Sequence, residues 1–163
     1  MPRIDVPADK DPLLYLWTTK AQALTPSAAA AYSSAVYERS TLPVREFEAA
    51  RITIARINDC QLCLGYRAAK EIPERAAGAE LDESFYAALL GDGVGLSERE
   101  ALAAEFADRF ATDHRNMDDA FWARLHAAFS DDELVELGLC VGAWVALGRF
   151  NQVFDVDGGC RVP

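Results

Sequence analysis

The sequence is short of positive charge and of histidine. Its 163 residues include 16 lysines and arginines against 26 aspartates and glutamates, with two histidines, so the formal net charge is −10. A chain this acidic is poorly matched to a phosphate backbone or an anionic membrane surface, so we expect no nucleic-acid and no membrane partner. The length and the 51% share of hydrophobic residues suit one core, which predicts a single domain over residues 1–163.

Long apolar segments are also missing. The first ten residues, MPRIDVPADK, lack the apolar stretch of a secretion signal. The longest uncharged apolar run, 137–148, is too short to cross a bilayer and is more typical of a buried core helix. We therefore expect a cytoplasmic protein. In that reducing compartment, the four cysteines indicate free, catalytic or metal-binding thiols rather than a disulfide framework.

Strand patterns are scarce, whereas helix start signals recur along the chain. These signals are polar caps before proline at Asp11 and Thr25, a cap at Asp82, and capping boxes at Ser97–Glu100 and Ser130–Glu133. They predict an all-α fold of seven to eight helices, near residues 12–19, 26–38, 44–58, 60–72, 83–91, 97–112, 118–129 and 131–150. The glycine-rich stretch 91–95 is the candidate seam between an N-terminal and a C-terminal set of helices.

The strongest chemical signal is the pair Cys60 and Cys63. Asp59 is a plausible N-cap, which would place Cys60 in the first turn of a helix and Cys63 at the start of the second. Side chains three residues apart share a helical face and come close enough for a disulfide. The helix N-terminus favours the thiolate, which is the nucleophilic form of cysteine. The motif therefore predicts a reactive thiol with a partner one turn away.

Three other interpretations compete with redox chemistry. A zinc site needs about four ligands, and the remaining candidates have unsuitable spacings: His114, His126, Cys140 and Cys160. A thioredoxin fold needs a strand before the motif, and none is visible. Two simply buried cysteines remain the main alternative. We favour redox chemistry and expect neither a metal nor a cofactor. Cys140 lies in the apolar run and is expected in the core, while Cys160 lies in the C-terminal tail.

Glu48 is a second candidate, twelve residues before Cys60 on the preceding predicted helix. It shares a helical face with Ile52 and Ala55, at the border of the apolar stripe. A partly buried carboxylate there is suited to proton transfer. The alternative is a solvated residue at the helix border, which spacing alone favours.

These residues resemble the signature of the carboxymuconolactone decarboxylase superfamily, in its alkylhydroperoxidase D-like (AhpD-like) branch. The family pattern is a glutamate, a twelve-residue step to CxxC, and an asparagine just before the first cysteine; Glu48, Asn58, Cys60 and Cys63 match it. The segment Leu147–Asn151 also resembles the end of the family's C-terminal helix. The family core would span about residues 40–155.

The resemblance implies an AhpD-like helical bundle that forms homo-oligomers, commonly trimers or hexamers. It implies a thiol peroxidase in which Cys63 attacks a hydroperoxide, Cys60 resolves the product as a disulfide, Glu48 begins a proton relay and an unidentified thiol reductant closes the cycle. Two residues depart from this pattern, because Leu62 and Arg67 stand where the peroxidase branch carries histidines. Arg67 cannot act as a base, but on a continuous helix it would lie one turn after Cys63 and stabilise its thiolate.

Two other functions remain open. A cofactor-independent lactone decarboxylase belongs to the same superfamily, although that branch usually lacks the paired cysteines. A non-catalytic helical oligomer could use the cysteine pair to sense oxidants or only for packing. The sequence names neither the substrate nor the reductant.

Overall fold

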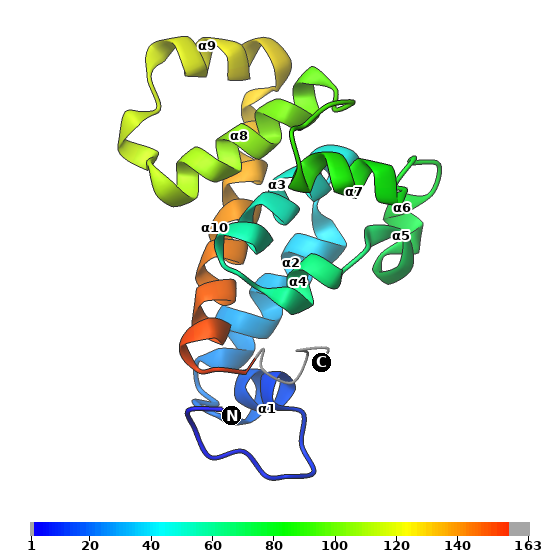
Figure 1. The fold of residues 1–163 in the computed structure, drawn as a ribbon. Helices are drawn as coiled ribbons and strands as arrows, with labels where there is room; N and C mark the ends of the chain where they lie inside the picture. Colours follow the sequence, from blue (N-terminus) through cyan, green and yellow to red (C-terminus); the bar gives the residue numbers. More distant parts are fainter. Residues whose placement is uncertain (1, 157–163) are drawn as a thin grey trace.

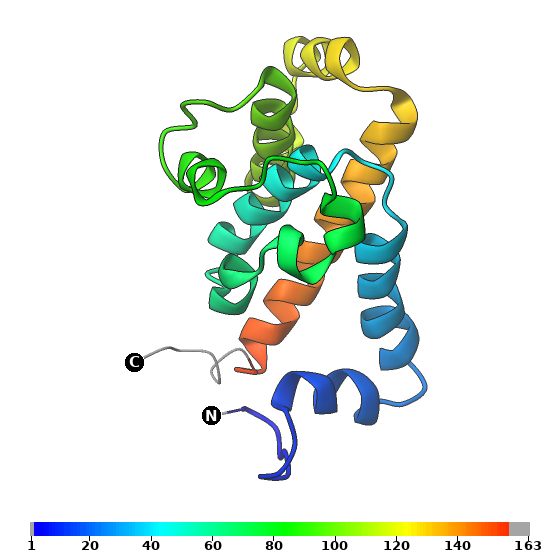
Figure 2. The ribbon, with the colours of Figure 1, turned by 90° about the vertical axis from the view of Figure 1, so that its right-hand side faces the viewer.

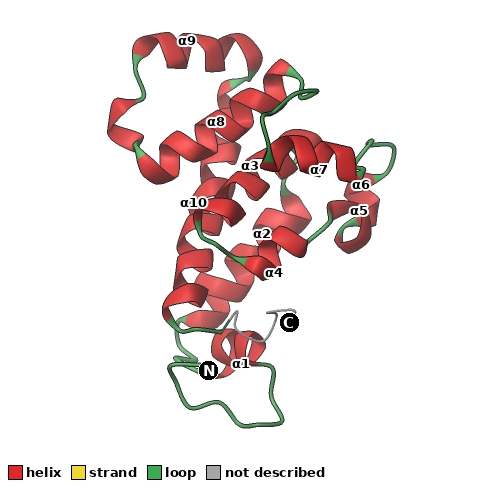
Figure 3. Ribbon diagram, in the orientation of Figure 1, coloured by secondary structure: helices red, strands yellow, loops and turns green. Residues whose placement is uncertain are grey.

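The computed structural model describes residues 2–156 and consists of helices joined by short loops (Figures 1 and 3). No strand occurs among these residues, which confirms the all-α prediction, but they contain ten α-helices rather than the seven to eight expected. The α-helices are α1 (Pro12–Thr19), α2 (Ala31–Arg39), α3 (Val44–Ile57), α4 (Gln61–Gly65), α5 (Ala68–Glu71), α6 (Pro73–Ala76), α7 (Glu83–Leu90), α8 (Glu98–Thr112), α9 (Asp119–Ala128) and α10 (Asp131–Val153). A π-helical turn, η1 (Pro26–Ala30), leads into α2, and a 3₁₀ turn, η2 (His114–Asn116), precedes α9.

Helix α3 is the central element of the fold. Helices α8, α10 and α7 pack around it, and α2 lies beside α10 (Figures 1 and 2). Side chains such as Phe47 on α3, Leu102 on α8 and Val141 on α10 are fully buried in the shared core. Because α3 is covered by several neighbours, polar groups on it must find their partners inside the protein. Glu48 is one of these groups.

Most of the predicted helix starts are confirmed. The side chains of Asp11, Asp82, Ser97 and Ser130 each accept a backbone N–H in the first turn, and both capping boxes are complete. The prediction at Thr25 is wrong, because its backbone is already helical and its hydroxyl donates to the Lys20 carbonyl. The following turn is accordingly π-helical rather than a capped α-helix.

The loop at 91–95 turns the chain from α7 into α8 but does not divide the core. Helix α8 packs on α3 more extensively than any other pair of helices in the described part of the chain. The two sets of helices on either side of this loop therefore share one hydrophobic core.

Helix α10 carries the apolar run 137–148. One face is buried, with Leu137, Cys140 and Trp144 in the core, as expected. The opposite face is not, since Val135 is 65% and Leu139 57% exposed. Burial on all sides is thus not observed within this chain.

None of the described helices combines the length and the apolarity that crossing a membrane requires.

Gly148 allows α10 to approach the end of α3. An added Cβ at Gly148 would overlap Asn58 Nδ2 and lie 3.3 Å from its Cγ. Asn58 has little room to move aside, because Nδ2 donates to the Trp144 carbonyl at 3.0 Å and the residue is buried. Glycine at this position therefore sets the distance between α10 and the segment that leads into the cysteine pair.

Replacing Gly148 by alanine should lower the free energy of unfolding by about 1–3 kcal/mol through overpacking. Gly142→Ala is the matched control on the same helix, because its Cβ would meet only the Tyr32 hydroxyl at 3.6 Å. Gly142→Ala should leave the free energy of unfolding unchanged or raise it by up to about 1 kcal/mol, since alanine is a better helix former than glycine. Urea unfolding of the two variants measures the difference; equal stabilities would show that the contact at Gly148 is not limiting.

Candidate active site around the cysteine pair

A tight turn between α3 and α4 places the cysteine pair. Asp59 has a positive φ of 51° and is not the N-cap that the sequence suggested. Cys60 is itself the N-cap of α4 and has an extended backbone. Its backbone N–H donates a hydrogen bond to the Ala55 carbonyl at 3.0 Å. The turn thereby brings Cys60 back against the end of α3.

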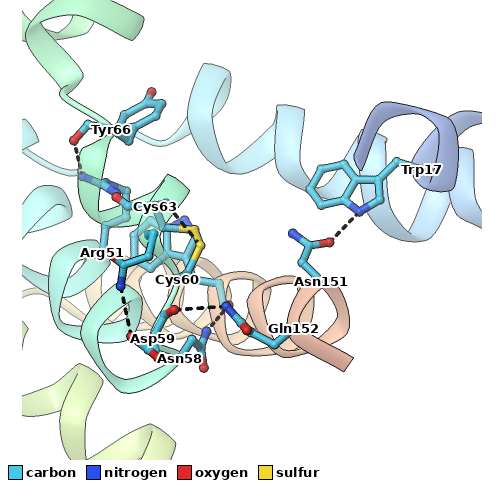
Figure 4. Close-up of a disulfide and its surroundings, with 11 residues drawn as sticks. Trp17, Arg51, Asn58, Asp59, Cys60, Cys63, Tyr66, Asn151 and Gln152 are labelled. Atoms are coloured by element: carbon cyan, nitrogen blue, oxygen red, sulfur yellow. Dashed lines mark hydrogen bonds between the residues drawn. A yellow bond between two sulfur atoms is a disulfide. The ribbon is translucent and has the colours of Figure 1, made fainter. Parts of the chain in front are cut away.

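Cys60 and Cys63 form a disulfide, with their Cα atoms 5.2 Å apart (Figure 4). The backbone N–H of Cys63 donates to the Cys60 sulfur at 3.2 Å. Cys60 is fully buried, whereas Cys63 is partly exposed. The two sulfurs are therefore in bonding contact but differ in access from outside.

The continuous helix predicted over 60–72 is wrong. Helix α4 ends at Gly65, Tyr66 and Arg67 are extended, and the separate short helices α5 and α6 follow. The reason lies in the backbone carbonyls at the break. Those of Cys63, Leu64 and Tyr66 accept hydrogen bonds from the guanidinium groups of Arg51 and Arg67. Arginine donors replace the N–H groups that a longer helix would have supplied.

Arg67 does not occupy the place expected for it. Because α4 ends before Arg67, this residue is not on a helical face shared with Cys63. Its guanidinium forms a bidentate ion pair with Glu83 at 2.7 and 3.0 Å and stacks on the ring of Tyr86. Arg67 is thus directed toward α7, where it ties the segment after the cysteines to the rest of the fold.

Arg51, rather than Arg67, is the cation that contacts Cys63 itself, since Arg67 donates only to the carbonyls of Leu64 and Tyr66 in this segment. Arg51 Nη1 donates to the Cys63 carbonyl at 2.6 Å and its Nη2 to the Tyr66 carbonyl at 3.1 Å. The guanidinium also lies 4.6 Å from the centre of the Tyr66 ring. Arg51 is only 1% exposed. One buried side chain on α3 therefore binds a carbonyl in the middle of α4 and the carbonyl of its C-cap.

Glu48 neutralises this buried arginine. Its two oxygens accept from Arg51 Nε at 2.6 Å and Nη2 at 2.9 Å, and the Tyr86 hydroxyl donates to Oε2 at 2.7 Å. Burial alone would lower the pKa of Arg51, but the hydrogen bonds and charge of Glu48 outweigh it and raise that pKa. Burial, followed by the charge of Glu48, also raises the pKa of Tyr86, so its hydroxyl remains a donor. Glu48 is completely buried rather than at a solvated border.

A small pocket lies next to Cys63. It has a volume of about 70 Å³ and lies between α3, α10, α2, α4 and α1. Its walls are mainly aromatic and aliphatic; they include Trp17, Tyr37, Arg51, Asn58, Trp144 and Leu147 together with Cys63. Cys60 is not among the lining residues. The pocket therefore gives a small molecule access to one cysteine of the pair.

The other candidate ligands are not assembled into a site. Among the described residues, no group of three or more histidine, cysteine, aspartate or glutamate side chains is placed to hold a metal. Cys140 is buried in the core as expected, and burial raises the pKa of its thiol to about 11, so it stays protonated near neutral pH. Cys160 lies outside the described residues.

Sequence reasoning missed Arg51, Tyr86 and Trp17. A signal for Arg51 was present, because it follows Glu48 by three residues on the same predicted helix, where opposite charges pair. Tyr86 and Trp17 carry no comparable signal. They reach the site from α7 and α1 through long-range contacts that no local pattern encodes.

Comparison with known proteins shows similarity to a distant relative. The chain is 31% identical over 122 residues to the uncharacterized protein YnjA of Escherichia coli (strain K12), an alignment that covers 74% of this chain and 64% of YnjA. The chain thus spans less than two thirds of that relative. No protein-family model matches the sequence. No solved structure matches it either. The superfamily resemblance therefore stays a prediction.

The Glu48–Arg51 pair should be strongly coupled in stability. Glu48→Leu leaves a buried cation, and Arg51→Met a buried carboxylate, so each should lower the free energy of unfolding by about 3–5 kcal/mol. The double variant should cost less than the sum of the two, with a coupling energy of about 2–3 kcal/mol. Urea unfolding of the four proteins in this cycle measures that energy.

The Arg67–Glu83 pair is the matched control, because Glu83 is 75% exposed and solvent weakens the interaction. The double-mutant cycle built from Arg67→Met and Glu83→Leu should give a coupling energy of about 1 kcal/mol or less. Equal coupling in the two cycles would contradict a special role for the buried pair.

Proposed function

We propose that this protein is a thiol-dependent hydroperoxide reductase that cycles between a Cys60–Cys63 dithiol and disulfide. The observation that carries the proposal is the disulfide-bonded pair with only Cys63 facing a small, largely apolar pocket. The helical fold and the Glu48 to CxxC spacing support it, since both agree with the resemblance to the alkylhydroperoxidase D-like branch.

Access supports Cys63 as the attacking thiol. A peroxide that enters the pocket meets Cys63, while Cys60 is fully buried behind it. Cys60 suits the resolving role, because the Cys63 backbone N–H can stabilise its thiolate for attack on an oxidised Cys63. Helix α4 is a single turn, so its dipole adds less than the longer predicted helix would have added.

Arg51 takes the place of the absent histidines in this proposal. It is the buried cation beside Cys63, whereas Leu62 is 41% exposed and Arg67 is paired with Glu83. A fixed positive charge favours thiolate without acting as a base. The contacts of Glu48 support a positioning role, because both of its oxygens are occupied by Arg51 and Tyr86. The proton relay implied by the resemblance stays a prediction.

The proposed reaction has three steps, and each is balanced in atoms and electrons. The Cys63 thiolate attacks the terminal oxygen of the hydroperoxide, the O–O bond breaks, and one proton from solvent converts the departing alkoxide into an alcohol. The Cys60 thiolate then attacks the resulting sulfenic acid; the S–S bond forms, and the hydroxide that leaves takes a proton to become water. A thiol reductant finally supplies two electrons and two protons to restore both thiols.

The test uses reduced protein in a Cys140→Ser, Cys160→Ser background. One equivalent of ethyl hydroperoxide should oxidise both remaining thiols and yield one equivalent of ethanol. Adding Cys63→Ser should abolish rapid consumption. Adding Cys60→Ser should leave one fast turnover and a sulfenic acid on Cys63 that dimedone traps, as mass spectrometry can show.

Two results would contradict the proposal. Rapid consumption that survives Cys63→Ser would assign the chemistry to another group. No consumption by the wild type, even with excess dithiothreitol, would leave a non-catalytic cysteine pair. Decarboxylation of an acidic lactone by the same preparation would favour the second enzyme class instead.

The trimer or hexamer implied by the resemblance also remains a proposal. The exposed apolar side chains of α10, Val135 and Leu139, support it, because a contact with a second copy would bury them.

A further inference from the structure

The pocket beside Cys63 has a wall from outside the expected family core. That core spans about residues 40–155, but Trp17 on α1 lines the pocket together with Cys63. The indole N–H of Trp17 donates to Asn151 Oδ1 at 3.0 Å, near the end of α10 (Figure 4). A second hydrogen bond also joins the N-terminal segment to the region after α10: the Arg3 backbone N–H donates to the Phe154 carbonyl at 2.9 Å. Trp17 is therefore held in place rather than merely resting on the surface.

Asn58, which also lines the pocket, carries a buried polar atom without a hydrogen-bond partner in the described part of the chain. Asn58 Nδ2 donates to the Trp144 carbonyl, which fixes the orientation of the amide. Within the described residues, Asn58 Oδ1 is buried and has no hydrogen-bond partner. A buried acceptor without a partner costs about 1–3 kcal/mol, and because this oxygen has almost no accessible surface, it is a cost within the fold rather than a contact offered to a molecule in the pocket.

The pocket is small for an organic substrate. Its volume of about 70 Å³ is roughly half that of the ~150 Å³ cavity that accommodates benzene in another protein. This volume suits a short alkyl chain with a hydroperoxide group better than an aromatic ring. Trp17 has the largest side chain among the three lining residues that precede residue 40, the other two being Ser33 and Tyr37.

We propose that Trp17, held by Asn151, is a specificity-determining residue that restricts the pocket beside Cys63 to small substrates. This inference rests on the proposed function for the identity of the substrate as a short-chain hydroperoxide. The size limit itself rests only on the pocket and on the placement of Trp17. The two can therefore be tested separately.

The first measurement does not depend on peroxidase activity. In the reduced Cys140→Ser, Cys160→Ser background, Cys63 is labelled with iodoacetamide and with the bulkier N-phenylmaleimide, and the two rates are compared by mass spectrometry. The series Trp17→Phe, Trp17→Leu and Trp17→Ala should raise the bulky-to-small rate ratio progressively. In Trp17→Ala, this ratio should be at least about 10-fold higher than in the protein with Trp17, which is the discrimination that one misfitting methylene group can produce.

The second measurement compares the rates at which the same proteins consume cumene hydroperoxide and ethyl hydroperoxide. The ratio of the cumene rate to the ethyl rate should rise in the same order of variants. Trp122→Ala is the matched control, because Trp122 lies on α9, is 36% exposed and does not line the pocket. Circular dichroism establishes that each variant is folded, and the phenylalanine and leucine variants keep an apolar side chain at position 17.

The outcomes separate the two claims. Labelling ratios that stay constant across the series, or that respond equally to Trp122→Ala, would overturn the assignment of Trp17. Labelling that responds as expected while no hydroperoxide is consumed would support the size limit and refute the proposed function. Hydroperoxide turnover with size ratios unchanged in both measurements would refute the size limit alone.

Discussion

The buried ion pair between Glu48 and Arg51 is the interaction on which the cysteine site depends. Both side chains are almost completely removed from solvent on the central helix α3. Two such charges are stable there only when their remaining donors and acceptors are satisfied. Tyr86 satisfies one carboxylate oxygen, and the carbonyls of Cys63 and Tyr66 satisfy the guanidinium. The charge pair and the turn that carries Cys63 thus require each other.

This arrangement explains why the cysteine segment is not one long helix. A continuous helix would use the carbonyls of Cys63 and Tyr66 internally and leave the Arg51 donors without partners in the core. Ending α4 after one turn releases those carbonyls and leaves Cys63 beside the pocket. The interruption also frees Arg67 to pair with Glu83 on α7. The local shape of the site is therefore a consequence of placing one arginine in the core.

The elements that the sequence predicted well are those that local chemistry controls. Caps at Ser97 and Ser130 lie within a few residues of the groups they bond, so the starts of α8 and α10 were visible in the sequence. The α4 interruption was not visible, because it depends on Arg51, twelve residues before Cys63 on another helix. The same holds for Trp17, whose partner Asn151 lies at the other end of the chain. Residue types identified the chemistry of the site, while long-range contacts determined its geometry.

The pH dependence of Cys63 alkylation tests most directly whether Arg51 activates this thiol. The measurement uses iodoacetamide on reduced protein in the Cys140→Ser, Cys160→Ser background, with Cys60→Ser added so that one thiol remains. Arg51→Gln should move the midpoint of alkylation to higher pH by about one unit or more, toward the value of ~8.5 for an ordinary cysteine. Arg51→Lys keeps the charge and should restore most of that shift, while Arg67→Gln should leave the midpoint unchanged. A midpoint that follows Arg67 rather than Arg51, or that responds to neither, would contradict the account.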